Sequence, residues 1–131
     1  MIWRDVILSL LPPKTGLSRT LAEVFDVAYE QVDVVDLVKD ISVEYSVNCI
    51  VSKVSGTFPW LLSFYLDFEV NDDLSIVVRL CAAFSCEALI SNDENLDPYP
   101  MVLVNQSMEA RIVNIDLERL EEDEAYVVCV M

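Results

Sequence analysis

Two neighbouring segments of alternating hydrophobicity constrain the fold of this chain most. Apolar residues occupy every second position from Val43 to Val51, and again from Leu62 to Val70. Successive side chains of a strand point to opposite faces, so residues 42–54 and 62–70 are each predicted to form a strand with one buried face. Gly56 lies in the turn between them, which predicts an antiparallel hairpin with a loop longer than two residues.

Helical periodicity appears before and after this hairpin. Apolar residues recur at helical spacing from Leu21 to Val32, which predicts an amphipathic helix over about 18–31. This helix either continues through the valine-rich residues 32–40 or stops before them, because β-branched residues fit a helix poorly. A second helix is predicted from an Asn71 cap to about Ser85, and a short third one over 117–123 with Asp116 as its cap.

The rest of the chain is predicted to be mostly strands. Residues 2–11 could form a helix or a strand, which Pro12 and Pro13 would end. Strands are predicted over 86–90, 99–104, 109–115 and 125–130. Helices and strands in this order predict an α+β fold, mainly an antiparallel sheet with two or three helices packed on one face.

Length and charge limit the class of protein. A chain of 131 residues with 54% hydrophobic residues is predicted to be a single domain, 1–131, with a proper core. Its 23 acidic and 8 basic residues give a net charge of −15, which argues against direct binding of nucleic acid or anionic membranes. The start of the chain lacks the features of a signal peptide and no segment is long enough to span a membrane, so we expect a cytoplasmic protein.

No cofactor or metal is expected from the residue types present. The chain has no His, and its four cysteines lie in apolar surroundings without a second paired motif, so they are predicted to be reduced, largely buried thiols rather than zinc ligands. Asp93, Asn95 and Asp97 have calcium-loop spacing, but Pro98 stands where the turn needs Gly. No nucleophile or phosphate-binding motif is present, so an enzyme is not expected.

The most unusual feature is a row of acidic residues with gaps of three or four. If the segment were one helix, all of its carboxylates would fall within an arc of about 140°. Its members are Glu23, Asp26, Glu30, Asp33, Asp36, Asp40 and Glu44. Neighbouring like charges at this spacing are destabilising by about 0.2–0.5 kcal/mol per pair. Either the row is a solvated helix face whose repulsion the fold tolerates, or a cationic partner neutralises it.

Two further acidic clusters favour the second interpretation. One is on the predicted last helix, where Arg119 is the nearest basic residue to the acids between Glu118 and Glu124. The other is the loop with Asp93, Glu94 and Asp97, beside Tyr99, an aromatic anchor candidate between two prolines. Charge of one sign at three places produces a field that attracts partners of opposite charge and speeds association.

Part of the chain is similar to small acidic immunity proteins of bacterial toxin systems. The resemblance covers residues 80–93, 97–99 and 101–104, a pattern of helix, strand, acidic turn, Pro-Tyr and strand. It implies a cytoplasmic protein that binds one cognate toxin domain, often a basic nuclease, and blocks it. No individual residue role is carried over, because the binding surfaces of such proteins diverge.

These observations lead to one functional hypothesis and two alternatives. The chain is expected to be a non-enzymatic inhibitor that masks a cationic protein, of unknown oligomeric state. The predicted partner-binding residues are Glu23, Asp26, Glu30, Asp33, Asp36 and Asp40, together with the patch Asp93, Glu94, Asp97 and Tyr99. The alternatives are a nucleic-acid mimic that inhibits a DNA-binding protein and an acidic adaptor or chaperone for a basic exported protein.

Overall fold

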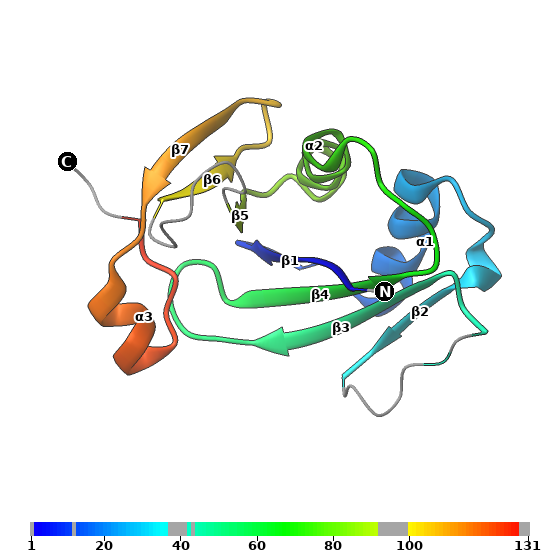
Figure 1. The fold of residues 1–131 in the computed structure, drawn as a ribbon, viewed down its shortest axis with the longest axis horizontal. Coiled ribbons are helices and arrows are strands. Elements are labelled where there is room, and N and C mark those ends of the chain that lie inside the picture. Colours follow the sequence, from blue (N-terminus) through cyan, green and yellow to red (C-terminus); the bar gives the residue numbers. More distant parts are fainter. Residues whose placement is uncertain (1, 12, 37–41, 43, 92–99, 129–131) are drawn as a thin grey trace.

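One mixed sheet organises the whole computed structural model, which describes residues 2–11, 13–36, 42, 44–91 and 100–128. Within these residues the sheet has seven strands in the order β2-β3-β4-β1-β5-β6-β7, and only the pair β2–β3 is parallel (Figure 1). The strands are β1 (Ile2–Leu8), β2 (Val32–Val35), β3 (Val47–Lys53), β4 (Trp60–Leu66), β5 (Ala88–Ser91), β6 (Pro100–Val104) and β7 (Ala110–Asn114). The helical elements are α1 (Lys14–Phe25), the 3-10 turn η1 (Tyr29–Gln31), α2 (Asp73–Phe84) and α3 (Leu117–Asp123). The predicted α+β class is therefore confirmed.

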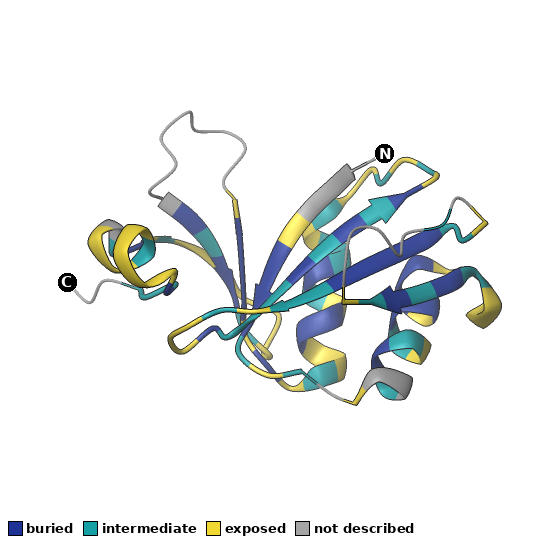
Figure 2. Ribbon diagram, turned by 90° about the horizontal axis from the view of Figure 1, so that it is seen from below, coloured by how far each residue is buried: buried dark blue, intermediate teal, exposed yellow. Residues whose placement is uncertain are grey.

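Two helices cover one face of the sheet. α1 and α2 lie side by side on it, and their buried faces meet those of the central strands (Figure 2). The Phe25 ring of α1 lies 5.7 Å from the Phe64 ring of β4, and Leu80 of α2 is fully buried. Most of the hydrophobic driving force for folding is expected to come from this layer.

The opposite face carries a smaller apolar cluster at the far end of the sheet. Along β1, Val6 and Leu8 belong to the helix-covered core, whereas Ile7 belongs to the second cluster. Leu120 of α3 and Tyr126 pack against that second cluster. Val6, Ile7 and Leu8 of β1 are thus buried on both faces of the sheet, which explains why these residues do not alternate with polar ones.

The predicted first helix is the largest local difference between sequence and structure. α1 ends at Phe25 instead of extending to residue 31 or beyond. Asp26 adopts the left-handed conformation (φ 56°), and the Val27 N–H donates to the carbonyl of Ala22 over 3.0 Å. This backbone arrangement closes a helix C-terminus, and Asp tolerates positive φ better than most residues. The valines that follow form β2.

The other boundaries differ by a few residues. β3 begins at Val47 instead of residue 42, because the buried Asn48 side chain donates to the carbonyls of Ser42 and Tyr45 and holds a turn there. β4 ends at Leu66, and Phe68 instead packs edge-on against Phe25.

The hairpin of β3 and β4 is antiparallel, as predicted, and 117–123 is a helix. Residues 2–8 are a strand, and among the described residues the predicted strand 125–130 is reduced to isolated bridges.

α2 begins at a side-chain cap one residue later than predicted. The Asp72 carboxylate, not Asn71, accepts a hydrogen bond from the Ser75 N–H over 3.0 Å. Asp72→Ala is expected to lower the free energy of unfolding by about 1 kcal/mol, because a helix N–H loses its partner. Urea denaturation followed by circular dichroism measures the change.

Asp72→Asn is the control for this prediction. The Asn side chain keeps the accepting oxygen but removes the charge, so its effect is expected to be within a few tenths of a kcal/mol. If Asp72→Asn destabilised the protein as much as Asp72→Ala, the contribution of Asp72 would be electrostatic and not a cap.

Candidate acidic interface

The predicted acidic row does not form one helix face. Glu23 is exposed on α1, Asp26 follows its last turn, Glu30 lies in η1, and Asp33 lies in β2. Asp36 follows β2 and is exposed, and Asp40 lies outside the described residues. The idea of a single helical row is wrong, because the chain changes direction at Asp26 and again enters the sheet at Val32.

Part of the row is instead brought together with acids that come from elsewhere in the chain. β2 and β3 begin, and β4 ends, at the same end of the sheet, because Val32 pairs with Val47 and Val47 pairs with Leu66. The Asp67 N–H donates to the Ser46 carbonyl over 3.1 Å, and the Ser46 hydroxyl donates to Gln31 Oε1 over 3.2 Å. Through Ser46, Gln31, the neighbour of Glu30, therefore lies close to Asp67.

A contact between two aromatic rings packs the end of α1 against the segment that follows β4. The Phe25 and Phe68 rings are 6.0 Å apart. Asp26 follows Phe25, and Asp67 and Glu69 flank Phe68, so all three belong to one end of the molecule, seen at the right of Figure 1. We call this surface the acidic end; it comprises Glu23, Asp26, Glu30, Asp33, Asp67 and Glu69.

The carboxylates of the acidic end are available to a partner. Asp33 is half-buried and the other five are exposed. Among the described residues, none of the six forms an ion pair. Arg79 of α2 reaches this end, where its Nη1 donates to the Val24 carbonyl over 3.3 Å. A cation at a helix C-terminus is favourable, so Arg79 serves the end of α1.

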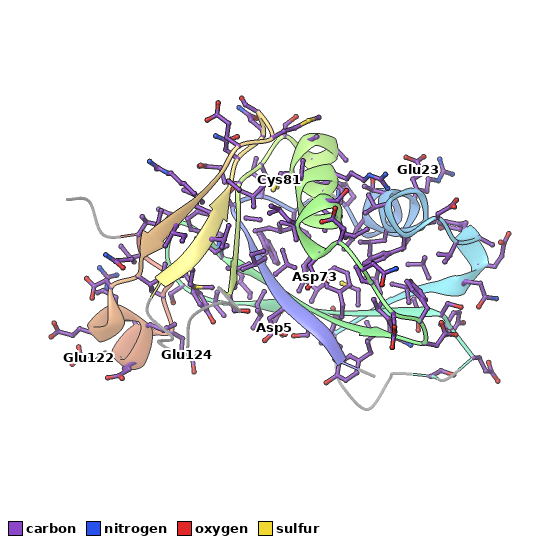
Figure 3. All side chains as sticks on the ribbon, turned by 45° about the horizontal axis from the view of Figure 1, so that its top comes forward. Asp5, Glu23, Asp73, Cys81, Glu122 and Glu124 are labelled. Atoms are coloured by element: carbon purple, nitrogen blue, oxygen red, sulfur yellow. The ribbon has the colours of Figure 1, made fainter. Side chains whose placement is uncertain are left out.

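A second acidic surface lies at the opposite end of the molecule. Figure 3 shows Glu122 and Glu124 far from Glu23. This α3 cluster comprises the exposed residues Glu118, Glu121, Glu122, Asp123 and Glu124. Arg119 Nε lies 2.8 Å from Asp123 Oδ2, so part of the α3 charge is compensated locally. Two acidic clusters in the described part of the chain therefore lie at opposite ends of the molecule.

The third predicted patch cannot be placed on either surface. Asp93, Glu94, Asp97 and Tyr99 lie outside the described residues. They stay a prediction.

Asp67 and Glu69 are not among the residues that the sequence predicts to bind a partner. The alternation over residues 62–70 predicts only that both lie on the exposed face of a strand. The sequence does indicate that both side chains are exposed, because they alternate with apolar residues at the end of the segment. What the sequence does not contain is the folding of this segment against Gln31 and Phe25, which are more than thirty residues away in the chain.

Two adjoining cavities were also not foreseen. The first, of about 380 Å³, includes Ser9, Cys86, Glu87 and Asn105 in its lining, and the second, of about 340 Å³, shares Glu87 and Asn105 with it. The Ser9 hydroxyl accepts a hydrogen bond from the Glu87 N–H over 2.9 Å, which fixes one wall. Asn105 Oδ1 accepts from the N–H groups of Ser107 and Glu109 at 2.9 and 3.0 Å and orders the other.

The cysteines were predicted to be buried thiols. Cys49, Cys81 and Cys86 are buried free thiols, and Cys129 lies outside the described residues. Burial raises the pKa of Cys49 well above its ordinary value, so this thiol stays protonated and unreactive. In the part of the chain that the structure describes, no three Cys, Asp or Glu side chains are grouped to hold a metal ion.

These features define an α+β domain with a mixed seven-stranded sheet and carboxylates gathered at its ends. No protein-family model matches the chain, no curated protein matches its sequence, and no solved structure matches its fold. Over the described residues, no helix has the length and apolar character needed to cross a membrane.

Proposed function

We propose that this protein binds a cationic protein through the acidic end and acts as an immunity-type inhibitor of a basic toxin domain, with a nuclease as the first candidate. The observation that carries the proposal is the convergence of carboxylates from α1, η1, β2 and the segment after β4 without ion pairs among the described residues. Four of the six carboxylates come from residues 23–33, and the fold adds Asp67 and Glu69 from the segment after β4.

A surface of this kind lowers the stability of the free protein. Carboxylates held near one another repel, and each close pair lowers stability by a few tenths of a kcal/mol. A partner that presents Lys and Arg removes this repulsion and forms charge-assisted hydrogen bonds. The same field raises the rate of encounter with a cationic surface.

A nuclease is the kind of cationic partner that the acidic end fits best. A nuclease holds the phosphates of its substrate with Lys and Arg side chains. Carboxylates on a rigid sheet end can occupy those side chains and keep the substrate out. The net charge of −15 makes the whole domain a poor ligand for nucleic acid itself, so a complex with DNA or RNA would not compete.

The salt dependence of binding tests the proposal. The probes are purified basic nuclease domains, beginning with the product of the reading frame adjacent to this gene. Affinity is expected to fall at least about tenfold between 50 and 200 mM NaCl, because surface charge pairs are screened over about 10 Å. At the lower salt concentration, one equivalent of the protein is expected to stop cleavage of a DNA or RNA substrate.

Three results would change this conclusion. Failure to bind any of the basic domains at low salt would overturn the proposal. Tight binding that does not depend on salt would favour an adaptor that uses apolar contacts. Binding to DNA-binding domains without enzymatic activity, but not to nucleases, would favour a nucleic-acid mimic.

A further inference from the structure

The C-terminus of α2 brings two cysteines together. Ser85 adopts the left-handed conformation (φ 51°), and the Cys86 N–H donates to the Cys81 carbonyl over 3.1 Å. In a helix end of this type, the residue after the left-handed one packs against the last turn of the helix. The contact between the two side chains is usually hydrophobic. Here both residues are cysteines, and the thiol of each shifts the pKa of the other, as expected for neighbouring side chains.

The two thiols are not equivalent. The neighbouring Cys81 thiol and, to a lesser extent, the Leu10 backbone lower the pKa of Cys86 despite burial and the nearby Glu87. The neighbouring Cys86 thiol, together with burial, raises the pKa of Cys81. Cys86 is therefore the thiol that reaches the nucleophilic thiolate form first.

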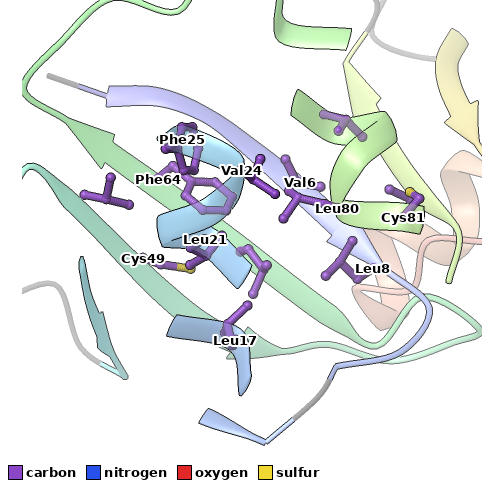
Figure 4. Close-up of a cluster of buried hydrophobic side chains, with 14 of the residues drawn as sticks. Val6, Leu8, Leu17, Leu21, Val24, Phe25, Cys49, Phe64, Leu80 and Cys81 are labelled. Atoms are coloured by element: carbon purple, nitrogen blue, oxygen red, sulfur yellow. The ribbon is translucent and has the colours of Figure 1, made fainter. Parts of the chain in front are cut away.

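The thiols of Cys86 and Cys81 also differ in how a small molecule could reach them. Cys86 lines the cavity of about 380 Å³, together with polar groups of Ser9 and Asn105. Cys81 is fully buried in the core on the inner side of α2 (Figure 4), where its thiol donates a hydrogen bond to the Val104 carbonyl over 3.6 Å. A small molecule that enters the cavity thus meets Cys86 first, with Cys81 behind it.

We propose that Cys81 and Cys86 are a dithiol that small neutral or cationic disulfides oxidise reversibly to an intrachain disulfide. In the first step the Cys86 thiolate attacks one sulfur of the small disulfide, forms a mixed disulfide and releases one small thiolate. Cys81 Sγ then attacks Cys86 Sγ, and the second small thiolate leaves and takes up the proton of Cys81. Two electrons pass from the two cysteines to the small disulfide, which becomes two small thiols.

The charge around the cavity determines which disulfides react. Glu87 lines the cavity, and the protein carries a net charge of −15. An anionic disulfide such as glutathione disulfide is repelled, whereas dicationic cystamine is attracted. This selectivity is independent of the acidic end and of the proposed function.

Mass spectrometry after thiol trapping tests the proposal. The protein carries Cys129→Ser, is treated with cystamine at pH 7.5, quenched with acid and labelled with N-ethylmaleimide in denaturant. The expected product has a Cys81–Cys86 disulfide and a label only at Cys49. Cystamine is expected to react at least about tenfold faster than glutathione disulfide, after correction for their rates with 2-mercaptoethanol.

Single variants separate the two roles. Cys81→Ser is expected to stop at the mixed disulfide on Cys86. Cys86→Ser is expected to leave Cys81 unmodified while the parent protein reacts to completion, and Cys86→Ala replaces it if circular dichroism shows that the Ser variant does not fold. Equal reaction of Cys81 without Cys86, equal reaction of Cys49, a persistent mixed disulfide in the parent, or a preference for glutathione disulfide would each overturn the proposal.

Discussion

Leu80→Ala is expected to lower the free energy of unfolding by about 3–5 kcal/mol, which is a large part of the stability of a small domain. Leu80 is fully buried between α2 and the sheet, in the cluster that includes Val6, Leu21 and Phe64 (Figure 4). Truncation removes buried methyl groups and leaves a cavity that the packed neighbours fill only in part. Urea denaturation followed by circular dichroism measures the loss.

Leu74→Ala is the matched control for this prediction. Leu74 lies on the same helix and loses the same atoms, but 42% of its surface is exposed. Its replacement is expected to change the free energy of unfolding by less than about 1 kcal/mol. Equal losses at the two positions would mean that burial on the inner face of α2 is not the source of the stability that Leu80 contributes.

Reversal of charge at the acidic end is expected to have the largest effect on binding. The triple variant Glu30→Lys, Asp67→Lys, Glu69→Lys is expected to slow association with the basic nuclease domain at least about tenfold at low salt. These three side chains are exposed and come from two segments that the fold brings together. Asp26 is left unchanged because its left-handed conformation favours Asp. Stopped-flow or surface-plasmon kinetics give the association rate.

The same number of reversals on α3 provides the control. Glu118→Lys, Glu121→Lys, Glu122→Lys changes the net charge equally, but at the other end of the molecule (Figure 3). Its effect on association is expected to be several-fold smaller, because screening limits the field to about 10 Å. Equal slowing by both variants would mean that only net charge matters, and stronger slowing by the α3 variant would place the interface there.

Several elements were predictable because they depend on contacts within a few residues. The alternation before and after Gly56 predicts the β3–β4 hairpin, since a strand buries every second side chain. Asp116 and the residues after it predict α3, because the cap bonds to an N–H three positions along the chain. Both predictions are confirmed.

Other features depend on contacts that the sequence does not reveal. Helical spacing of acids continues through residues 23–44, yet Val32–Val35 form a strand because they pair with β3, and this pairing outweighs local preference. The position of β1 between β4 and β5 likewise follows from burial on both its faces. A local pattern cannot distinguish these outcomes from a longer helix.

The sequence by itself determined the fold class, the excess of negative charge and the apolar setting of the cysteines, because each follows from composition or from short-range periodicity. The tertiary structure alone decided which carboxylates share a surface, since Glu30 and Asp67 lie at the same end of the sheet because Ser46 bonds to both Gln31 and Asp67. It also decided that Cys86 faces a cavity while Cys81 lies in the core. Both depend on segments distant in the chain, whose packing is determined by the fold as a whole.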